Sequence, residues 1–301
     1  MNVFYCDDFV LPLPEGHRFP MRKYSLLRQR VLAEGLASPD AMCVPDAATD
    51  QQILRCHEQG YLDKVKSGTL SEKEIRRIGF PWSPQLVERS RRSTGATIGA
   101  CLSALTYGAG INLAGGTHHA CSDHGEGFCV FNDAAIAARE MQASGRARRV
   151  LVVDCDVHQG NGTAQITQDD PSIFTFSIHG EKNFPFRKFA SNIDIGLPDG
   201  VTDADYLDMV DEGLSRAIFI ADPDLAIYVS GADPFIGDRL GKLSISKHGL
   251  KLRDRLVLET LRFRKIPVAV VMGGGYANNV DDIVDIHVET VRITVQLEKV
   301  L

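Results

Sequence analysis

The sequence predicts an α/β protein with a central, mainly parallel sheet that helices cover on both faces. Two observations predict it: several short apolar runs have the composition of buried strands, and helical patterns lie between them. Parallel strands require long crossover connections, which are usually helical, so this alternation favours a parallel sheet. Because no repeat, low-complexity tract or linker interrupts the chain, residues 1–301 are expected to form a single domain.

The strands are predicted in the second half of the chain. Each is a run of mostly apolar, often β-branched residues. In sheets of this kind ligands collect beyond the carboxyl ends of the strands, so the residues that follow these runs are candidates for a site. The predicted strands are residues 148–154, 172–178, 224–230 and 266–272.

Helices are predicted between these strands and through much of the first half. In residues 203–220, Leu207, Val210 and Leu214 recur at three- and four-residue spacing, which is typical of an amphipathic helix. Residues 247–264 repeat this pattern. In the first half, long helices are expected at residues 21–34, 85–107 and 128–143.

The composition argues against several classes of protein. A formal net charge of -6 disfavours binding to nucleic acid, because nonspecific affinity for phosphates needs a basic surface. The seven cysteines include no Cys-x-x-Cys spacing, which favours reduced thiols in a reducing compartment. The N-terminus lacks the features of a signal peptide, and no apolar run has membrane-spanning length, so we expect a cytoplasmic protein without a membrane partner.

An Asp-x-Asp-x-His pattern follows the predicted strand at 148–154. Along an extended backbone Asp154, Asp156 and His158 point to one side, where two carboxylates repel each other unless a cation or hydrogen-bond donors hold them. Carboxylate oxygen and imidazole nitrogen together suit zinc, and also ferrous iron or cobalt. The alternative is that both aspartates cap a helix that begins near His158, and this segment alone does not decide between the two.

A third carboxylate follows another predicted strand. Asp233 comes just after residues 224–230, at a strand end from which it could approach the first two carboxylates. Its alternative role is that of an ordinary turn residue before Pro234. The coincidence of Asp233 with the pattern at 154–158 favours a metal site.

Two glycine-containing turns carry the remaining candidates. Tyr276 follows the glycines at 273–275, which form a turn that lets backbone pass close to a ligand. The phenol of Tyr276 could polarise a carbonyl there, and the alternative role of this side chain is packing. His118 and His119 follow the glycines at 115–116. This pair lacks the i, i+4 spacing of chelating histidines and suits acid–base chemistry better, although surface histidine pairs are often incidental.

In these segments the sequence resembles the histone deacetylase family of the arginase/deacetylase superfamily, and within it the bacterial, class IV-like branch. The similarity covers most of the chain and keeps the family's order of motifs, which implies an arginase/deacetylase-like fold. The motifs are GGTHHA (115–120), GEGFCVFNDAAIAA (125–138), VDCDVHQGNGTA (153–164), FSIHGEKNFPF (176–186), SGADPF (230–235) and GGGY (273–276).

The resemblance implies that Asp156, His158 and Asp233 bind zinc. A structural monovalent cation such as potassium is also implied. The residues that would surround this second ion are Asp154, Asp156, His158, Ser177 and Ile178.

The resemblance also implies which groups act on the substrate. His118 and His119 would be the paired catalytic histidines, with Asp154 supporting His118, and Tyr276 would polarise the carbonyl. Where many class I members carry an aspartate that supports the second histidine, this sequence has Asn161. Since an amide cannot stabilise an imidazolium as a carboxylate does, we expect the pKa of His119 to be less elevated than in the members that carry the aspartate.

A tunnel for the aliphatic chain of the substrate is the last implied feature. Phe128 and Phe184 would flank it, next to Gly127 and Gly274. The implied reaction is zinc-dependent hydrolysis of the amide of an Nε-acyl-lysine by a metal-activated water, with histidine acid–base catalysis and a tyrosine that stabilises the oxyanion. The substrate would be an acylated peptide or protein, or an acylated small amine.

Two alternative functions stay open. An amidohydrolase that acts on acetylpolyamines or other small molecules would use the same chemistry, and such cationic substrates favour acidic residues and a restricted entrance. A non-catalytic protein that binds acyl-lysine would be indicated by loss of Tyr276 or of a metal ligand. All of these residues are present.

Overall fold

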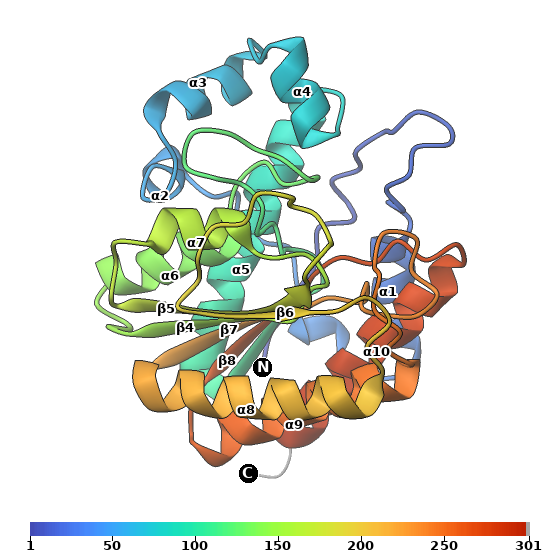
Figure 1. Cartoon of the computed structure of the whole chain (residues 1–301). Coiled ribbons are helices and arrows are strands. Elements are labelled where there is room, and N and C mark those ends of the chain that lie inside the picture. Colours follow the sequence, from blue (N-terminus) through green and yellow to red (C-terminus); the bar gives the residue numbers. More distant parts are fainter. Residues whose placement is uncertain (299–301) are drawn as a thin grey trace.

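A computed structural model describes residues 1–298 and contains one eight-stranded sheet (Figure 1). The strand order is β2-β1-β3-β8-β7-β4-β5-β6, and all neighbouring strands are parallel. The predicted α/β fold is therefore confirmed, with a sheet that is parallel throughout. The strands are β1 (Val3–Phe4), β2 (Met42–Cys43), β3 (Ala109–Asn112), β4 (Val150–Asp154), β5 (Ile173–Gly180), β6 (Ile193–Leu197), β7 (Leu225–Ser230) and β8 (Val268–Met272).

Helices cover both faces of the sheet, as predicted. Figure 1 shows α8 and α9 along one face and α5, α6 and α7 over the other, with α2, α3 and α4 beyond them. Along β4, Leu151 and Val153 face one buried apolar cluster while Val150 and Val152 face the other, as the period of two in a strand requires. The helices are α1 (Lys23–Ala33), α2 (Asp50–Ile53), α3 (Gln59–Ser67), α4 (Glu72–Ile78), α5 (Pro84–Tyr107), α6 (Asp133–Ala143), α7 (Asn161–Thr167), α8 (Asp203–Ala221), α9 (Lys247–Phe263) and α10 (Val280–Glu298).

The four predicted strands correspond to β4, β5, β7 and β8, with bounds that agree within two residues. The apolar patterns missed the other four strands. β1 and β2 have two residues each and β3 has four, which is too short for a recognisable pattern. β6 lies at the edge of the sheet and buries only its two terminal residues.

The predicted helices correspond to α1, α5, α6, α8 and α9. The prediction that a helix begins at residue 128 is wrong, because α6 begins at Asp133. Phe128 has a φ of 67°, outside the helical region, and the side chain of Asn132 caps α6 by accepting a hydrogen bond from Ala135 N (3.0 Å). Among the described residues, no helix combines the length and apolarity that a membrane span requires.

The strand order brings the predicted site residues together. β3, β8, β7 and β4 are neighbours in the centre of the sheet. Parallel neighbours end at the same edge, so the loop with the two histidines, the glycine-rich turn, Asp233 and Asp156 all start from one edge of the sheet. Segments up to about half the chain apart therefore meet at a single site.

Candidate active site

Asp156, His158 and Asp233 converge beyond the carboxyl ends of β4 and β7. One ligand-type atom from each lies within 4.8 Å of the other two. His158 Nδ1 is 2.9 Å from Asp156 Oδ1 and 3.1 Å from Asp233 Oδ2, and all three residues are buried. Two carboxylates and an imidazole nitrogen are a donor set typical of zinc, so this group is a candidate metal centre.

Helix capping does not account for Asp154 and Asp156. The helix that follows, α7, begins at Asn161, and its N-cap residue Gly160 makes no side-chain cap. Cys155 packs in the apolar cluster on one face of the sheet, so the two aspartates on either side of it point away from that cluster. The geometry therefore favours the metal interpretation over the capping one.

The charges around this group also fit a cation. Asp156 is 1% exposed and Asp233 is 0% exposed. Within residues 1–298, their charge partners at ion-pair distance are histidines, not lysines or arginines. Burial, together with the neighbouring Asp156 carboxylate, raises the pKa of Asp233 to about 7. In the described part of the chain no lysine or arginine neutralises these two carboxylates, and a divalent cation would stabilise their ionised forms.

Backbone amides hold the two carboxylates in place. Gly274 N donates to Asp156 Oδ2 (2.6 Å), and Val157 N donates to Asp233 Oδ1 (3.0 Å). Such outer contacts orient metal ligands and keep the unused carboxylate oxygens hydrogen-bonded.

A buried arginine joins the ends of the two strands beneath the candidate metal centre. Arg253 of α9 is 0% exposed and donates to the carbonyl oxygens of Cys155 (3.2 Å) and Gly231 (2.7 Å). Its charge is balanced by Asp254, at 2.7 Å. Helix α9 thereby sets the position of β4 relative to β7, and with it the spacing of Asp156 and Asp233.

The two adjacent histidines have different partners and different ionisation. His118 Nδ1 is 2.6 Å from Asp154 Oδ2, and His119 Nδ1 is 2.7 Å from Asn161 Oδ1. Burial alone would lower the pKa of His118, but the Asp154 and Asp156 carboxylates outweigh burial and raise it to about 9. Burial and the charges of the neighbouring histidines hold the pKa of His119 well below its ordinary value.

The start of α6 anchors the loop that carries these histidines. Asp133 accepts hydrogen bonds from Thr117 N (2.8 Å) and Thr117 Oγ1 (2.7 Å). Asn132 Nδ2 donates to the carbonyl oxygens of His118 (3.3 Å) and Ala120 (3.1 Å). The loop is therefore held by buried hydrogen bonds rather than by regular secondary structure.

Asn161 is itself held by Glu126. Asn161 Nδ2 donates to Glu126 Oε1 at 2.6 Å. A carboxylate can only accept, so the amide must turn its NH₂ toward Glu126 and its oxygen toward His119. His119 Nδ1 then donates to that oxygen, which leaves Nε2 as the acceptor nitrogen of the neutral ring.

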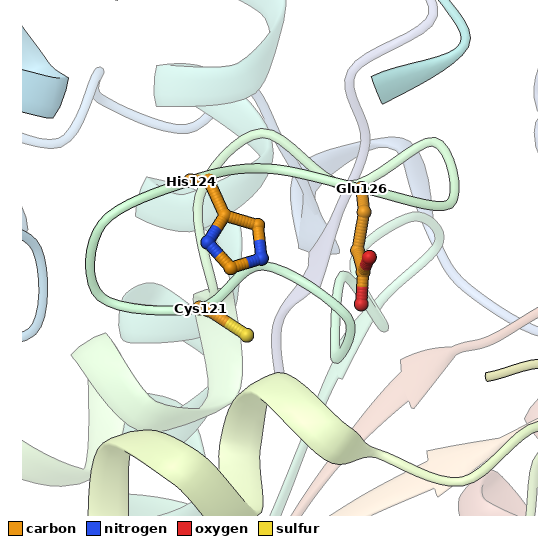
Figure 2. Close-up of side chains that lie close together, drawn as sticks. All are labelled: Cys121, His124 and Glu126. Atoms are coloured by element: carbon orange, nitrogen blue, oxygen red, sulfur yellow. The ribbon is translucent and has the colours of Figure 1, made fainter. Parts of the chain in front are cut away.

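Glu126 also lies in a second group of side chains that could hold a metal, together with Cys121 and His124 (Figure 2). However, Arg77 Nε donates to Glu126 Oε2 (3.0 Å), and Asn161 engages the other oxygen. Burial raises the pKa of the Cys121 thiol to about 12, so it stays protonated near neutral pH. We therefore interpret Glu126 as the support of Asn161 and not as a metal ligand.

Tyr276 lies beside the candidate metal centre. Its ring centroid is 6.3 Å from that of His158. Its backbone is held on both sides, because its N–H donates to Asp238 Oδ2 (2.6 Å) and its carbonyl oxygen accepts from Arg239 Nε (2.7 Å). Burial, with the charges of Asp233 and Asp156, raises the pKa of Tyr276 well above its ordinary value, so the phenol stays protonated and can donate.

A pocket of about 490 Å³ leads from the surface to His119, His158 and Tyr276. Phe128 and Phe184, predicted to flank a tunnel, line this pocket. The ring centroid of Phe128 is 5.9 Å from that of Tyr276, and the Phe184 centroid is 4.9 Å from that of His119. The pocket thus has aromatic walls beside the polar groups at its end.

The two glycines predicted at the tunnel lie at different depths. Gly127 lines the pocket, and a Cβ there would lie 2.7 Å from His119 Cδ2 and 3.0 Å from Phe184 Cε1. A Cβ on Gly274 would instead collide with Asp233 Oδ2. Gly274 therefore lies against the carboxylates, deeper than the pocket wall.

The residues predicted around a monovalent cation lie at or just after the end of β4 and in the second half of β5. Asp154 and Ser177 are partners in the register of these neighbouring strands, and Ile178 follows. Asp154, Ser177 and Ile178 are buried, and Ser177 Oγ is 2.9 Å from His179 Nδ1. The potassium ion itself stays a prediction.

Sequence patterns did not indicate several residues that support the site. Lys23 is buried, and its Nζ donates to the carbonyl oxygens of Gly273 (3.5 Å) and Gly275 (3.4 Å). Lys23 and Arg253 belong to helices remote in sequence from every motif, so no local signal marks them. Glu126 lies inside the segment 125–138, and its place there is the one signal that could have found it.

Comparisons with known proteins identify the family of this chain. The family model described as "Histone deacetylase domain" matches residues 17–291. An uncharacterized protein of Picosynechococcus sp. is 47% identical over 285 residues, which is 95% of each chain. Histone deacetylase 2 of Arabidopsis thaliana is 29% identical over 290 residues, 92% of this chain and 74% of that one.

A solved structure shares the fold as well. The acetylpolyamine aminohydrolase from Burkholderia pseudomallei covers 98% of this chain and 98% of its own, with a TM-score of 0.81 and 20% sequence identity. At this identity the similarity concerns the fold alone. The shared fold is the arginase/deacetylase-like fold that the motifs predicted. The family match over most of the sequence shows that this chain belongs to the histone deacetylase family of hydrolases.

Proposed function

We propose that this chain hydrolyses the amide bond of an Nε-acyl-lysine, with zinc held by Asp156, His158 and Asp233. The observation that carries the proposal is the buried donor set of these three side chains at the end of an aromatic-walled pocket. A pocket of this kind suits the aliphatic chain of an acylated lysine, whose amide would then reach the polar groups.

A zinc ion bound there would polarise the acyl carbonyl and lower the pKa of a water molecule to about 7. Ferrous iron or cobalt would suit the same donors. We also propose a structural potassium ion near Ser177. All seven cysteines are free, which fits the cytoplasm as the site of action, and we propose one domain over residues 1–301.

His119 is proposed as the general base and acid. Its ring is neutral near pH 7, and its Nε2 can accept the proton of the attacking water and then return it to the leaving amine. His118, with a raised pKa, would keep a positive charge beside the reacting carbonyl. Tyr276 would donate a hydrogen bond to the oxyanion, while Phe128 and Phe184 would contact the methylene groups of the substrate.

A substrate panel tests this proposal. Zinc-loaded protein would be assayed on peptides with acetyl-, longer acyl- and trifluoroacetyl-lysine and on acetylpolyamines, with and without chelator. Hydrolysis of the peptides, loss of activity with chelator and recovery with zinc are expected. If stoichiometrically zinc-loaded protein hydrolyses no member of the panel, the enzymatic proposal is wrong.

The same panel separates the alternative functions. The fold is shared with an acetylpolyamine aminohydrolase, so turnover of acetylpolyamines in preference to peptides would favour a small-molecule amidohydrolase. Saturable binding of acyl-lysine peptides without any turnover would instead indicate a non-catalytic binding protein.

The contact between Asn161 and Glu126 gives a specific expectation for one substitution. Asn161→Asp would place a second carboxylate about where the amide now donates to Glu126, and two such carboxylates repel or must share a proton. We expect kcat to fall by about tenfold, the lower end of what loss of a supporting partner costs. Glu126→Gln alone should have little effect, because its amide oxygen can still accept from Asn161.

Combining the two changes should restore activity, since the Gln side chain would donate to the new carboxylate. The measurement is a cycle of kcat and KM for the four proteins. Independent, multiplicative effects of the two substitutions would contradict the role of Glu126 as the support of Asn161.

Gly127→Ala is expected to impair catalysis through contact with His119. The new methyl group would lie 2.7 Å from His119 Cδ2, and the φ of 57° at this position disfavours any side chain. We expect the free energy of unfolding to fall by about 1 kcal/mol and kcat/KM to fall by about tenfold or more.

Gly145→Ala is a matched control for this substitution. Gly145 also has a positive φ (68°), but apart from its chain neighbours no atom of the described residues lies within 4 Å of the position its Cβ would take. Urea unfolding should therefore show a similar loss of stability in both variants, while kcat/KM falls in Gly127→Ala alone. Equal activities of the two variants would rule out the contact with His119 as the cause.

A further inference from the structure

The mouth of the pocket is surrounded by positive charge. Five exposed basic residues from the N-terminal loop, α4, the segment after β5 and the segment after β7 line it. The chain as a whole has a net charge of -6, so this concentration of basic side chains differs in sign from the rest of the molecule. The basic residues at the mouth are Arg18, Arg76, Arg77, Lys182 and Lys242.

Carboxylates neutralise only part of this surface, since Glu72 lies 3.2 Å from Arg76. Among the lining residues, all of them in the described chain, Glu126 is the one acidic side chain, and it pairs with Arg77. Within residues 1–298, no carboxylate lies within ion-pair distance of Arg18, Lys182 or Lys242. Positive charges without partners at the edge of a pocket create a field that attracts anions.

Two of these basic residues are in contact. Lys242 Nζ donates to the carbonyl oxygen of Lys182 at 3.2 Å, which holds one ammonium group against the backbone that carries the other lysine. Arg18 lies over the Phe128 ring, with its guanidinium carbon 5.1 Å from the centroid. The charged groups of Lys242 and Arg18 are thus positioned at the entrance by specific contacts.

At the inner end of the pocket, the two carboxylates of the candidate metal centre would balance the charge of a bound divalent cation. Asp156 and Asp233 are buried there, close to the position that the acyl group would take. The positive surface lies at the mouth, beside the part of the substrate that stays outside. A negative charge on the substrate is therefore favoured next to the acylated amine and not at the acyl end.

We propose that this hydrolase selects acyl-lysine peptides in which aspartate or glutamate flanks the acylated lysine, and that Lys182 and Lys242 are specificity-determining residues. This inference rests on the proposed function. Peptides with lysine or arginine beside the acylated residue, and free acetylpolyamines, carry positive charge into the same field and are disfavoured.

Three acetyl-lysine peptides of equal length test the proposal, with glutamate, glutamine or arginine on both sides of the acylated residue. At low salt, kcat/KM should be at least about tenfold higher for the acidic than for the basic peptide, as electrostatic steering produces. The ratio should approach one at about 1 M salt, where the Debye length is about 3 Å.

Charge reversal tests the two lysines. Lys182→Glu combined with Lys242→Glu should reduce or invert the ratio of kcat/KM for the acidic peptide to kcat/KM for the basic peptide. Arg146→Glu combined with Arg216→Glu is the matched control. It changes the net charge equally, at exposed residues that do not line the pocket, and should leave the preference unchanged.

Binding separates failure of this inference from failure of the proposed function. The dissociation constants of the three peptides would be measured by fluorescence polarisation with the Tyr276→Phe variant. Equal dissociation constants and equal kcat/KM for acidic and basic peptides would overturn the charge selection, even if every peptide is hydrolysed. Preferential binding of the acidic peptide without turnover by zinc-loaded wild-type protein would support charge selection and contradict hydrolysis.

Discussion

Replacing Asp233 by alanine is expected to abolish zinc binding and to reduce hydrolysis to the level of chelator-treated protein. Loss of a hydrogen-bond partner behind a metal ligand weakens metal affinity by about 10–100-fold. Removing one of the three ligands themselves should weaken it further. Metal content measured on the purified variant and kcat on an acetyl-lysine peptide test this expectation. Zinc should also raise the melting temperature of the wild type but not of the variant, because a ligand stabilises only the state that binds it.

A second substitution guards against misfolding as the cause. Asp233→Asn keeps the size of the side chain and an oxygen that can accept from Val157 N, so its circular dichroism spectrum should match that of the wild type while zinc binding is still lost or greatly weakened. Asp208→Ala, at an exposed position of α8, is a matched control and should keep full zinc content. An Asp233→Ala protein with wild-type zinc stoichiometry and activity would exclude Asp233 from the metal site.

Tyr276→Phe is expected to lower kcat by about 10²–10³ while KM changes little. This is the cost of removing one donor to an oxyanion, and the effect falls on kcat because that hydrogen bond strengthens only as negative charge develops. The substitution keeps the ring that packs near Phe128 and the backbone contacts with Asp238 and Arg239. Stability should therefore be close to that of the wild type.

Tyr107→Phe is the control for this substitution. Tyr107 is the last residue of α5 and is 51% exposed, so loss of its hydroxyl should change neither kcat nor stability. Zinc content should be unchanged in both variants, since neither hydroxyl belongs to the proposed ligand set. A Tyr276→Phe protein with wild-type kcat would remove Tyr276 from the mechanism.

The basic residues around the mouth of the pocket bear on the choice between acyl-lysine peptides and acetylpolyamines as substrates. Both acyl-lysine peptides and acetylpolyamines suit the aromatic walls of the pocket, so the interior does not distinguish them. The entrance distinguishes the two substrate classes, because free polyamines keep positive charges that would lie among Arg18, Lys182 and Lys242. A polyamine hydrolase would be expected to present acidic groups there instead.

Much of the fold follows from local patterns. The strands β4, β5, β7 and β8 were predictable because each is a long apolar run, and α8 and α9 because their apolar residues recur with helical spacing. The short strands β1, β2 and β3 offered no pattern, since their pairing depends on neighbours far away in sequence. The start of α6 was misplaced because Phe128 and Asn132 adopt conformations that only the surrounding loops select.

By itself, the sequence determined the parallel α/β architecture and the candidate groups of the site, because strand periodicity and the residues after a strand end are local properties of the chain. It left open whether Asp154 and Asp156 cap a helix, and the start of α7 at Asn161 answered that question. Tertiary structure alone decided which side chains support the site and which charges surround it. The physical reason is that the sheet order sets these contacts: Glu126 reaches Asn161 across 35 positions and Lys23 reaches Gly273 across 250, separations over which no sequence pattern acts.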